Sequence, residues 1–74
     1  MAKAKSGGAV YRVTEIIGTS PVSWEEAAKN AVETAAKSLR DLRVAEIEEL
    51  DLKVENGKVV AYRARVSLSF KYEA

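Results

Sequence analysis

Residues 43–73, RVAEIEELDLKVENGKVVAYRARVSLSFKYE, decide the fold of this chain. Two alternating runs, Arg43–Glu55 and Lys58–Glu73, flank the pair Asn56-Gly57. An Asn-Gly pair between alternating runs is a strong hairpin signal, because both loop residues of a type I′ turn need a positive φ. The sequence therefore predicts two long antiparallel strands joined by a two-residue turn.

The predicted turn also predicts the register of the hairpin and the residues on each face. The expected pairs are Glu55 with Lys58, Leu52 with Ala61, Leu50 with Arg63 and Glu48 with Arg65. One face then carries Val60, Tyr62, Ala64, Val66, Leu68 and Phe70, joined by Ala45 and Ile47. The other face carries Leu50, Leu52, Val54, Val59 and Ala61. Because one helix covers only one face of so small a sheet, the second patch predicts an interface with another subunit.

Composition narrows the class of protein. A chain of 74 residues forms one domain at most, and a core of this size needs a staple or an oligomer. Cys and His are both absent, which excludes disulfides and Cys/His zinc sites. A net charge of +1 with mixed signs argues against a nucleic-acid binder. The chain has no apolar run long enough to span a membrane and no signal-peptide core, so we expect a soluble cytoplasmic protein.

The first half of the chain predicts a leader, a strand and a helix. Residues 1–9 are small, polar and glycine-rich, and we expect a flexible leader before a domain at residues 10–74. Val10–Ile17 is β-branched and aromatic, which favours a strand. Ser23 and Glu26 form a capping box for a helix from Trp24 to Leu42. The helix should pack on the sheet through Ala28, Ala31, Val32, Ala35, Leu39 and Leu42.

These elements predict an α+β fold of order β-α-β-β, with one helix on a three-stranded antiparallel sheet. The first strand could lie beside either hairpin strand. Glu15 interrupts the apolar face of that strand, so it should lie at a sheet edge or pair across an interface.

Support for catalysis is thin. Without His or Cys, the chain lacks the commonest bases and nucleophiles, and it has no glycine-rich phosphate loop. Gly18-Thr19-Ser20 precedes the helix and is either a hydroxyl-capped turn or an anion site at the helix N-terminus, and the capped turn is favoured. Trp24 is expected to pack over the start of the helix rather than to stack on a ligand. We therefore expect a protein that is not an enzyme.

Carboxylates are densest at the start of the hairpin, at Glu46, Glu48, Glu49 and Asp51. In the predicted register Glu48 pairs with Arg65 and Glu46 lies diagonal to it, so cross-strand ion pairs account for both. Glu49 and Asp51 have no such partner. These two residues are therefore the candidate ligands for a hard cation such as calcium.

Several motifs together resemble one family. They are Tyr11-Arg12-Val13, Glu15-Ile16-Ile17-Gly18-Thr19-Ser20, Ser23-Trp24-Glu25-Glu26-Ala27, Ala35-Ala36-Lys37-Ser38-Leu39-Arg40 and Tyr62–Phe70. From Val10 to Glu73 the chain resembles the dodecins. That resemblance implies a sheet wrapped around the helix and a hollow homododecamer. It also implies storage of flavin between subunits rather than enzymatic activity.

The chain departs from the family at the flavin site. The positions that match this site are Val44, Asp51, Arg63 and Arg65. Val44 stands where the flavin-stacking Trp belongs, and Arg63 stands where a Gln hydrogen-bonds the ring. Asp51 stands where some members place an Arg toward the ligand phosphate. Because aromatic stacking is worth about 0.5–1.5 kcal/mol per pair, the loss predicts weak flavin binding.

The Arg43-Val44-Ala45-Glu46 run is closer to the calcium-dodecin branch, which lacks the flavin Trp. We therefore predict a homo-oligomeric shell that sequesters a small ligand or a cation such as calcium. The alternatives are storage of flavin or another anionic cofactor, and a structural oligomer with no ligand. Val44 and Arg63 should share the sheet face directed away from the helix. There Arg63 either pairs with a carboxylate of a neighbouring subunit or lines a reshaped pocket.

Overall fold

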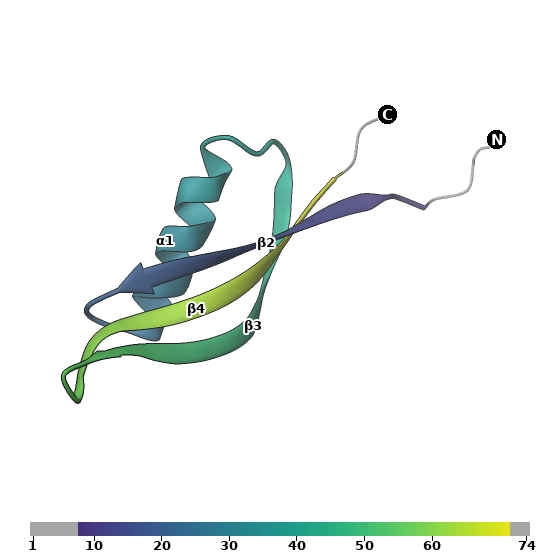
Figure 1. Ribbon diagram of the computed structural model, residues 1–74. Helices are drawn as coiled ribbons and strands as arrows, with labels where there is room; N and C mark the ends of the chain where they lie inside the picture. The colour runs from purple at the N-terminus through teal and green to yellow at the C-terminus, as the bar shows by residue number, and fades with distance from the viewer. Residues whose placement is uncertain (1–7, 72–74) are drawn as a thin grey trace.

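The computed structural model of the chain describes residues 8–71. It contains strand β2 (Tyr11–Ser20), helix α1 (Trp24–Ala36), strand β3 (Leu42–Glu55) and strand β4 (Lys58–Lys71). The strands form one antiparallel sheet in the order β2-β4-β3, and α1 lies across one of its faces (Figure 1). This confirms the predicted β-α-β-β order and shows that the first strand lies beside β4.

Two predicted segments fall partly outside the described residues. Of the expected leader at residues 1–9, only Gly8 and Ala9 are described. The last two residues of the expected final strand, 72 and 73, also lie outside the described residues. Within residues 8–71, no helix combines the length and the apolar character that crossing a membrane requires.

The hairpin turn forms as predicted, but the register beyond it does not. Asn56 has φ 52° and Gly57 has φ 74°, as a type I′ turn requires, and Glu55 lies opposite Lys58. The register then shifts between Lys53 and Val54, and again between Ile47 and Glu49. Such shifts are typical of β-bulges, which insert an extra residue on one strand. The observed pairs are Leu52 with Tyr62, Asp51 with Arg63, Leu50 with Ala64 and Glu49 with Arg65.

The shifts move four of the five apolar residues predicted for the second face to the opposite face of the sheet. Residues that lie directly opposite each other on neighbouring strands share a face. Leu50 and Leu52 therefore lie on the helix side, with Ala64 and Tyr62, and their predicted position on the other face is wrong. Val54 lies between Lys53 and Glu55, which pair on one face, and it is opposite Val59, so the predicted outer position of Val54 and Val59 is wrong as well. Ala61 is opposite Lys53 and does lie on the face directed away from α1, which we call the outer face.

Helix α1 begins at the predicted residue. The Ser23 hydroxyl accepts a hydrogen bond of 3.0 Å from the Glu26 N–H. The predicted return bond from the Glu26 carboxylate to the cap is wrong, because Glu26 Oε1 instead accepts from the Ser20 hydroxyl at 2.7 Å. Ser20 Oγ in turn accepts the N–H groups of Val22 and Ser23 at 2.9 and 3.4 Å. Gly18-Thr19-Ser20 is therefore not itself the predicted turn, because it pairs with β4 as the end of β2, and the turn capped by the Ser20 hydroxyl follows at Pro21-Val22.

The helix ends at Ala36, well before the predicted Leu42. The N–H groups of Ser38 and Leu39 both bond the carbonyl oxygen of Ala35, and Asp41 adopts φ 56°. Leu42 already pairs with Phe70 in the sheet. Pairing with β4 therefore overrides the local helix preference of the residues that follow Ala36.

Small residues bring α1 close to the sheet. The buried hydrophobic core consists of Ala27, Ala31, Ala64, Val66 and Leu68. Ala27 was absent from the predicted stripe, although it is fully buried. A Cβ on Gly18 would stand 2.1 Å from the Ala27 carbonyl oxygen and 2.8 Å from the Ala31 Cβ. Only glycine therefore fits at this point of contact.

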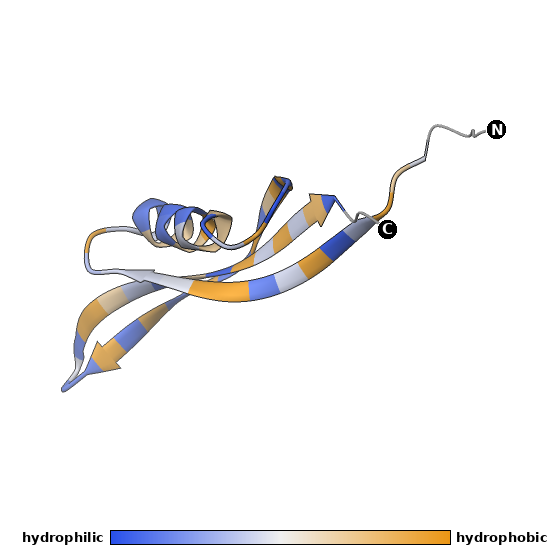
Figure 2. Ribbon diagram, turned by 90° about the horizontal axis from the view of Figure 1, so that it is seen from above, coloured by the Kyte–Doolittle hydropathy of each residue, from blue (hydrophilic) through white to orange (hydrophobic). Residues whose placement is uncertain are grey.

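The hairpin extends past the helix. The molecule measures 60 × 21 × 15 Å and its radius of gyration is 16.1 Å, against about 11 Å for a compact domain of this length. Apolar and polar residues alternate along the extended strands (Figure 2). On the helix side Leu50 and Val54 are 48% and 56% exposed, and on the outer face Ile17 and Val44 are 44% and 56% exposed. The isolated chain thus leaves apolar side chains of both sheet faces uncovered.

Candidate functional site

The outer face brings the sequence-predicted ligand positions into one array. Its rows each take one residue from β2, β4 and β3, and β4 lies at the centre. The rows are Thr19–Arg63–Asp51, Ile17–Arg65–Glu49, Glu15–Ser67–Glu46 and Val13–Ser69–Val44. We call this array the outer-face array. It contains all four residues that the sequence assigned to a ligand site, which are Val44, Asp51, Arg63 and Arg65.

Arg63 and Asp51 form a two-pronged ion pair. Arg63 Nε donates to Asp51 Oδ1 at 2.6 Å, and Arg63 Nη2 donates to Oδ2 at 2.9 Å. The hydrogen bonds from Arg63 lower the pKa of Asp51 below its ordinary value, and the same pair raises the pKa of Arg63. The expected pairing of Leu50 with Arg63 is wrong. The carboxylate partner of Arg63 also comes from its own chain, not from a neighbouring subunit.

Arg65 joins the two edge strands across the sheet. Its Nε lies 3.3 Å from Glu49 Oε1 on β3, and its Nη1 lies 3.5 Å from Glu15 Oε1 on β2. The predicted partner Glu48 is wrong, because the bulge near Ile47 places Glu49 opposite Arg65. Glu15 lies on an edge strand, as one of its two predicted settings required, and pairs within its own sheet.

These ion pairs engage the two carboxylates that the sequence selected as cation ligands. The sequence selected Glu49 and Asp51 as carboxylates without partners, and the structure shows that each has an arginine. Among residues 8–71, no three Asp or Glu side chains converge as metal ligands. Calcium takes six to eight oxygen ligands. The donor type therefore suits a hard cation, but the described part of one chain does not bring enough donors together.

Val44 and Arg63 share the outer face, as predicted, but they do not meet. Val44 lies opposite Ser69, and Asp51 lies opposite Arg63. Six residues of β4 separate these rows, which corresponds to about 20 Å along the strand. Val44 is 56% exposed. A ligand the size of an aromatic ring system cannot contact both residues on the same chain.

Trp24 packs as predicted and also makes a contact that sequence reasoning missed. Its ring meets the ring of Tyr62 edge to face, with centroids 5.3 Å apart and planes at 80°. Its indole Nε1 donates a hydrogen bond of 3.0 Å to the carbonyl oxygen of Asp51. Trp24 therefore connects the start of the helix to the backbone of a residue whose side chain holds Arg63. Only the position of Trp24 in the first turn pointed to packing here.

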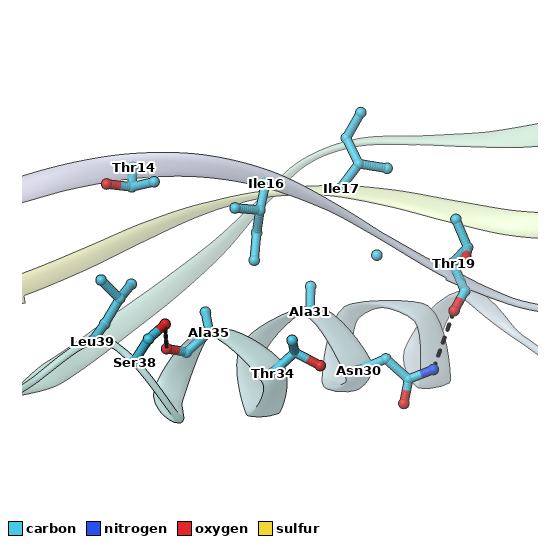
Figure 3. Close-up of a pocket in the computed structure, with 11 residues that line it drawn as sticks. Thr14, Ile16, Ile17, Thr19, Asn30, Ala31, Thr34, Ala35, Ser38 and Leu39 are labelled. Carbon is cyan, nitrogen blue, oxygen red and sulfur yellow. Dashed lines mark hydrogen bonds between the residues drawn. The ribbon is translucent and has the colours of Figure 1, made fainter.

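A groove of about 570 Å³ separates β2 from α1 (Figure 3). Ile16 points from the strand toward the helix, and Ala31, Ala35 and Leu39 lie on the other wall. At one end Asn30 Nδ2 donates to the carbonyl oxygen of Thr19 at 3.1 Å. None of the described residues that line the groove is charged. The groove was not predicted, and its uncharged walls are unsuited to a metal ion.

Comparisons with known proteins agree on one family. The family model described as Dodecin matches residues 10–73. The calcium dodecin of Mycobacterium tuberculosis is 48% identical over 62 residues, which are 84% of this chain and 87% of that protein.

Solved structures agree with these matches. The structure of dodecin from Streptomyces coelicolor matches with a TM-score of 0.85 at 35% identity, and the match covers 93% of this chain and 99% of that one. A crystal structure of the M. tuberculosis calcium dodecin, described as calcium chelating, matches with a TM-score of 0.78 at 48% identity. That match covers 88% and 93% of the two chains.

Proposed function

The chain belongs to the dodecin family, and on that premise we propose that it forms a homododecameric shell that sequesters a cation, calcium in the first instance. The observation that carries this proposal is the outer-face array of paired charges, bordered by apolar side chains that the chain leaves uncovered. A neighbouring copy would bury these apolar side chains and would bring its own charged groups to the array.

Assembly is supported by the uncovered hairpin. A core of five small or medium side chains is slight for a chain of this length. We propose that the interface includes Leu50, Leu52, Val54, Val59 and Ala61. Ala61 would be covered on the outer face and the other four on the helix side. The interface would therefore enclose the hairpin from both sides.

Cation binding is supported by the balance of charges and by the relatives. In the outer-face array, the carboxylates of Glu15, Glu46, Glu49 and Asp51 outnumber the guanidinium groups of Arg63 and Arg65. Glu49 is held by a single contact, and its side chain is 69% exposed, so it is more available than Asp51. Symmetry-related copies would supply the further oxygen ligands that calcium needs. The name and description of the M. tuberculosis relative point to the same ion.

A role in binding rather than in catalysis follows from the same residues. The chain has no His or Cys, and Asp51 and Glu49 are held by arginines. We propose that flavin binding is weak, because Val44 offers no aromatic face and Arg63 is engaged by Asp51.

Native mass spectrometry with calcium titration tests this function. We expect a dodecamer that takes up calcium and releases it to a chelator, with no uptake of magnesium at equal concentration. Glu49→Gln should reduce the uptake, whereas Glu33→Gln, on the exposed side of α1, should leave it unchanged. A monomer would contradict the shell, and an assembly that takes up no calcium would contradict the cation.

A further inference from the structure

Helix α1 is hydrogen bonded to both edges of the sheet at one row of the outer-face array. This row is Thr19–Arg63–Asp51. Trp24 Nε1 donates to the carbonyl oxygen of Asp51 at 3.0 Å, and Asn30 Nδ2 donates to the carbonyl oxygen of Thr19 at 3.1 Å. Asp51 lies on one edge strand and Thr19 on the other, so Arg63 lies between two strands that the same helix holds.

The geometry of the helix explains how one element reaches both edges. Trp24 and Asn30 are six residues apart, which places them about 120° apart around the helix axis. The two side chains therefore leave α1 on different flanks. Ala27 and Ala31 lie between them and press against the sheet at Gly18. Gly18 pairs with Ala64 in the row next to that of Arg63, so the closest approach of the helix lies beside this row.

The bond from Trp24 acts where β3 needs support. β3 is an edge strand, and register shifts lie on both sides of Asp51. Helix α1 packs mainly on β2 and β4, so β3 takes little support from the helix. Because the Asp51 carboxylate makes both bonds to Arg63, the position of the Asp51 backbone sets the position of the guanidinium.

We propose that Trp24 and Asn30 are positioning residues that hold the strands beside Arg63 and thereby fix the Arg63 guanidinium on the outer face. We call the two hydrogen bonds from Trp24 and Asn30 to the sheet edges the clamp. Its role rests on the proposed function, in which the outer face is the surface that copies share. The clamp also occupies the edge carbonyl groups of this row. A neighbouring copy therefore meets the row through its side chains and not by strand pairing.

Hydrogen exchange at the Arg63 Nε–H, followed by NMR on the full assembled chain with labelled arginine, tests the clamp. Trp24→Phe keeps an aromatic ring against Tyr62 but removes the donor. We expect exchange at Arg63 to accelerate by about three- to tenfold, since one hydrogen bond is lost. Asn30→Asp should give a smaller acceleration, because a carboxylate cannot donate to Thr19. Asp51→Asn gives the exchange rate of the Arg63 Nε–H when the ion pair is absent.

Two controls separate positioning from general loosening. The Arg65 Nε–H is an internal reference, because Arg65 lies in the next row and its partners are not bonded to the clamp. Ser38→Ala is the matched variant, because Ser38 follows the helix and, among residues 8–71, its hydroxyl bonds only the carbonyl oxygen of Ala35 in the last turn. An unchanged Arg63 rate in Trp24→Phe would overturn the proposal, as would an equal acceleration at Arg65.

The outcome is independent of the shell and its ion. Assembly mass and calcium uptake are measured on the same samples. If the unmodified chain neither assembles nor takes up calcium while Trp24→Phe still frees Arg63, the proposed function fails and the clamp stands. If the chain assembles and takes up calcium while Trp24→Phe leaves the exchange rate at Arg63 unchanged, the clamp is refuted and the proposed function stands.

Discussion

Gly18 lies directly against the backbone of Ala27, where an added Cβ would stand 2.1 Å from the carbonyl oxygen. The contact joins the C-terminal end of the edge strand β2 to the first half of α1. It sets the distance between helix and sheet, and with it the reach of Trp24 and Asn30 to the two sheet edges.

Replacing Gly18 with Ala should destabilise the chain by about 1–3 kcal/mol, since the helix must move away to admit the methyl group. Urea unfolding measures the loss. Gly57→Ala is the control, because nothing lies within 4 Å of a Cβ there and only the positive φ of 74° is strained. The control should cost about 1–2 kcal/mol through its backbone alone. If Gly18→Ala is as stable as the wild type and keeps the hydrogen bonds of Trp24 and Asn30, the contact does not set the distance between helix and sheet.

The Asp51–Arg63 pair should make stability depend on pH. The pKa of Asp51 in the folded chain lies below its ordinary value of 3.8, so its contribution is fully present above that value. The contribution is lost as pH falls through the folded-state pKa. Thermal melting between about pH 5 and pH 2 should therefore show a steeper loss in the wild type than in Asp51→Asn.

A double-mutant cycle checks the origin of that effect. Arg63→Gln should flatten the pH profile to the same extent, and the double variant Asp51→Asn with Arg63→Gln should add nothing further. Additive losses would show that the two side chains act separately.

Leu52→Asp should prevent assembly, because it places an unpaired charge in a contact that we expect to be buried between copies. Light scattering measures the particle mass, and circular dichroism checks that the chain remains folded. Lys29→Asp is the control, since that residue is exposed on α1 and lies outside the proposed interface. Intact particles of Leu52→Asp would remove Leu52 from the interface.

Restoring the aromatic face and the amide should restore flavin binding. Val44→Trp combined with Arg63→Gln should raise the affinity for flavin mononucleotide by about tenfold or more. Quenching of flavin fluorescence measures the change, and each single variant shows which position contributes. No gain in the double variant would mean that these residues do not occupy the family's flavin site.

Local signals in the sequence determined the order of the elements. Asn56-Gly57 predicts the turn because two consecutive positive φ values are needed there, and the structure has them. Ser23 predicts the start of the helix because its hydroxyl satisfies an N–H group that the first turn leaves free. The motifs from Val10 to Glu73 predict the family, and the comparisons confirm it.

Contacts between distant residues decided the rest. No local signal in the sequence predicts three features: the place of β2 beside β4, the early end of α1, and the hydrogen bond from Trp24 to Asp51. The two bulges that flank Asp51, one in β3 at Glu48 and one in β4 at Val60, had the largest effect, because a slip of one residue moves a side chain to the other face of a sheet. They turned Leu50 and Leu52 toward the helix side and gave Asp51 and Glu49 their arginine partners. A sequence read by alternation alone cannot locate such a slip, because bulges depend on how the paired strand twists and packs.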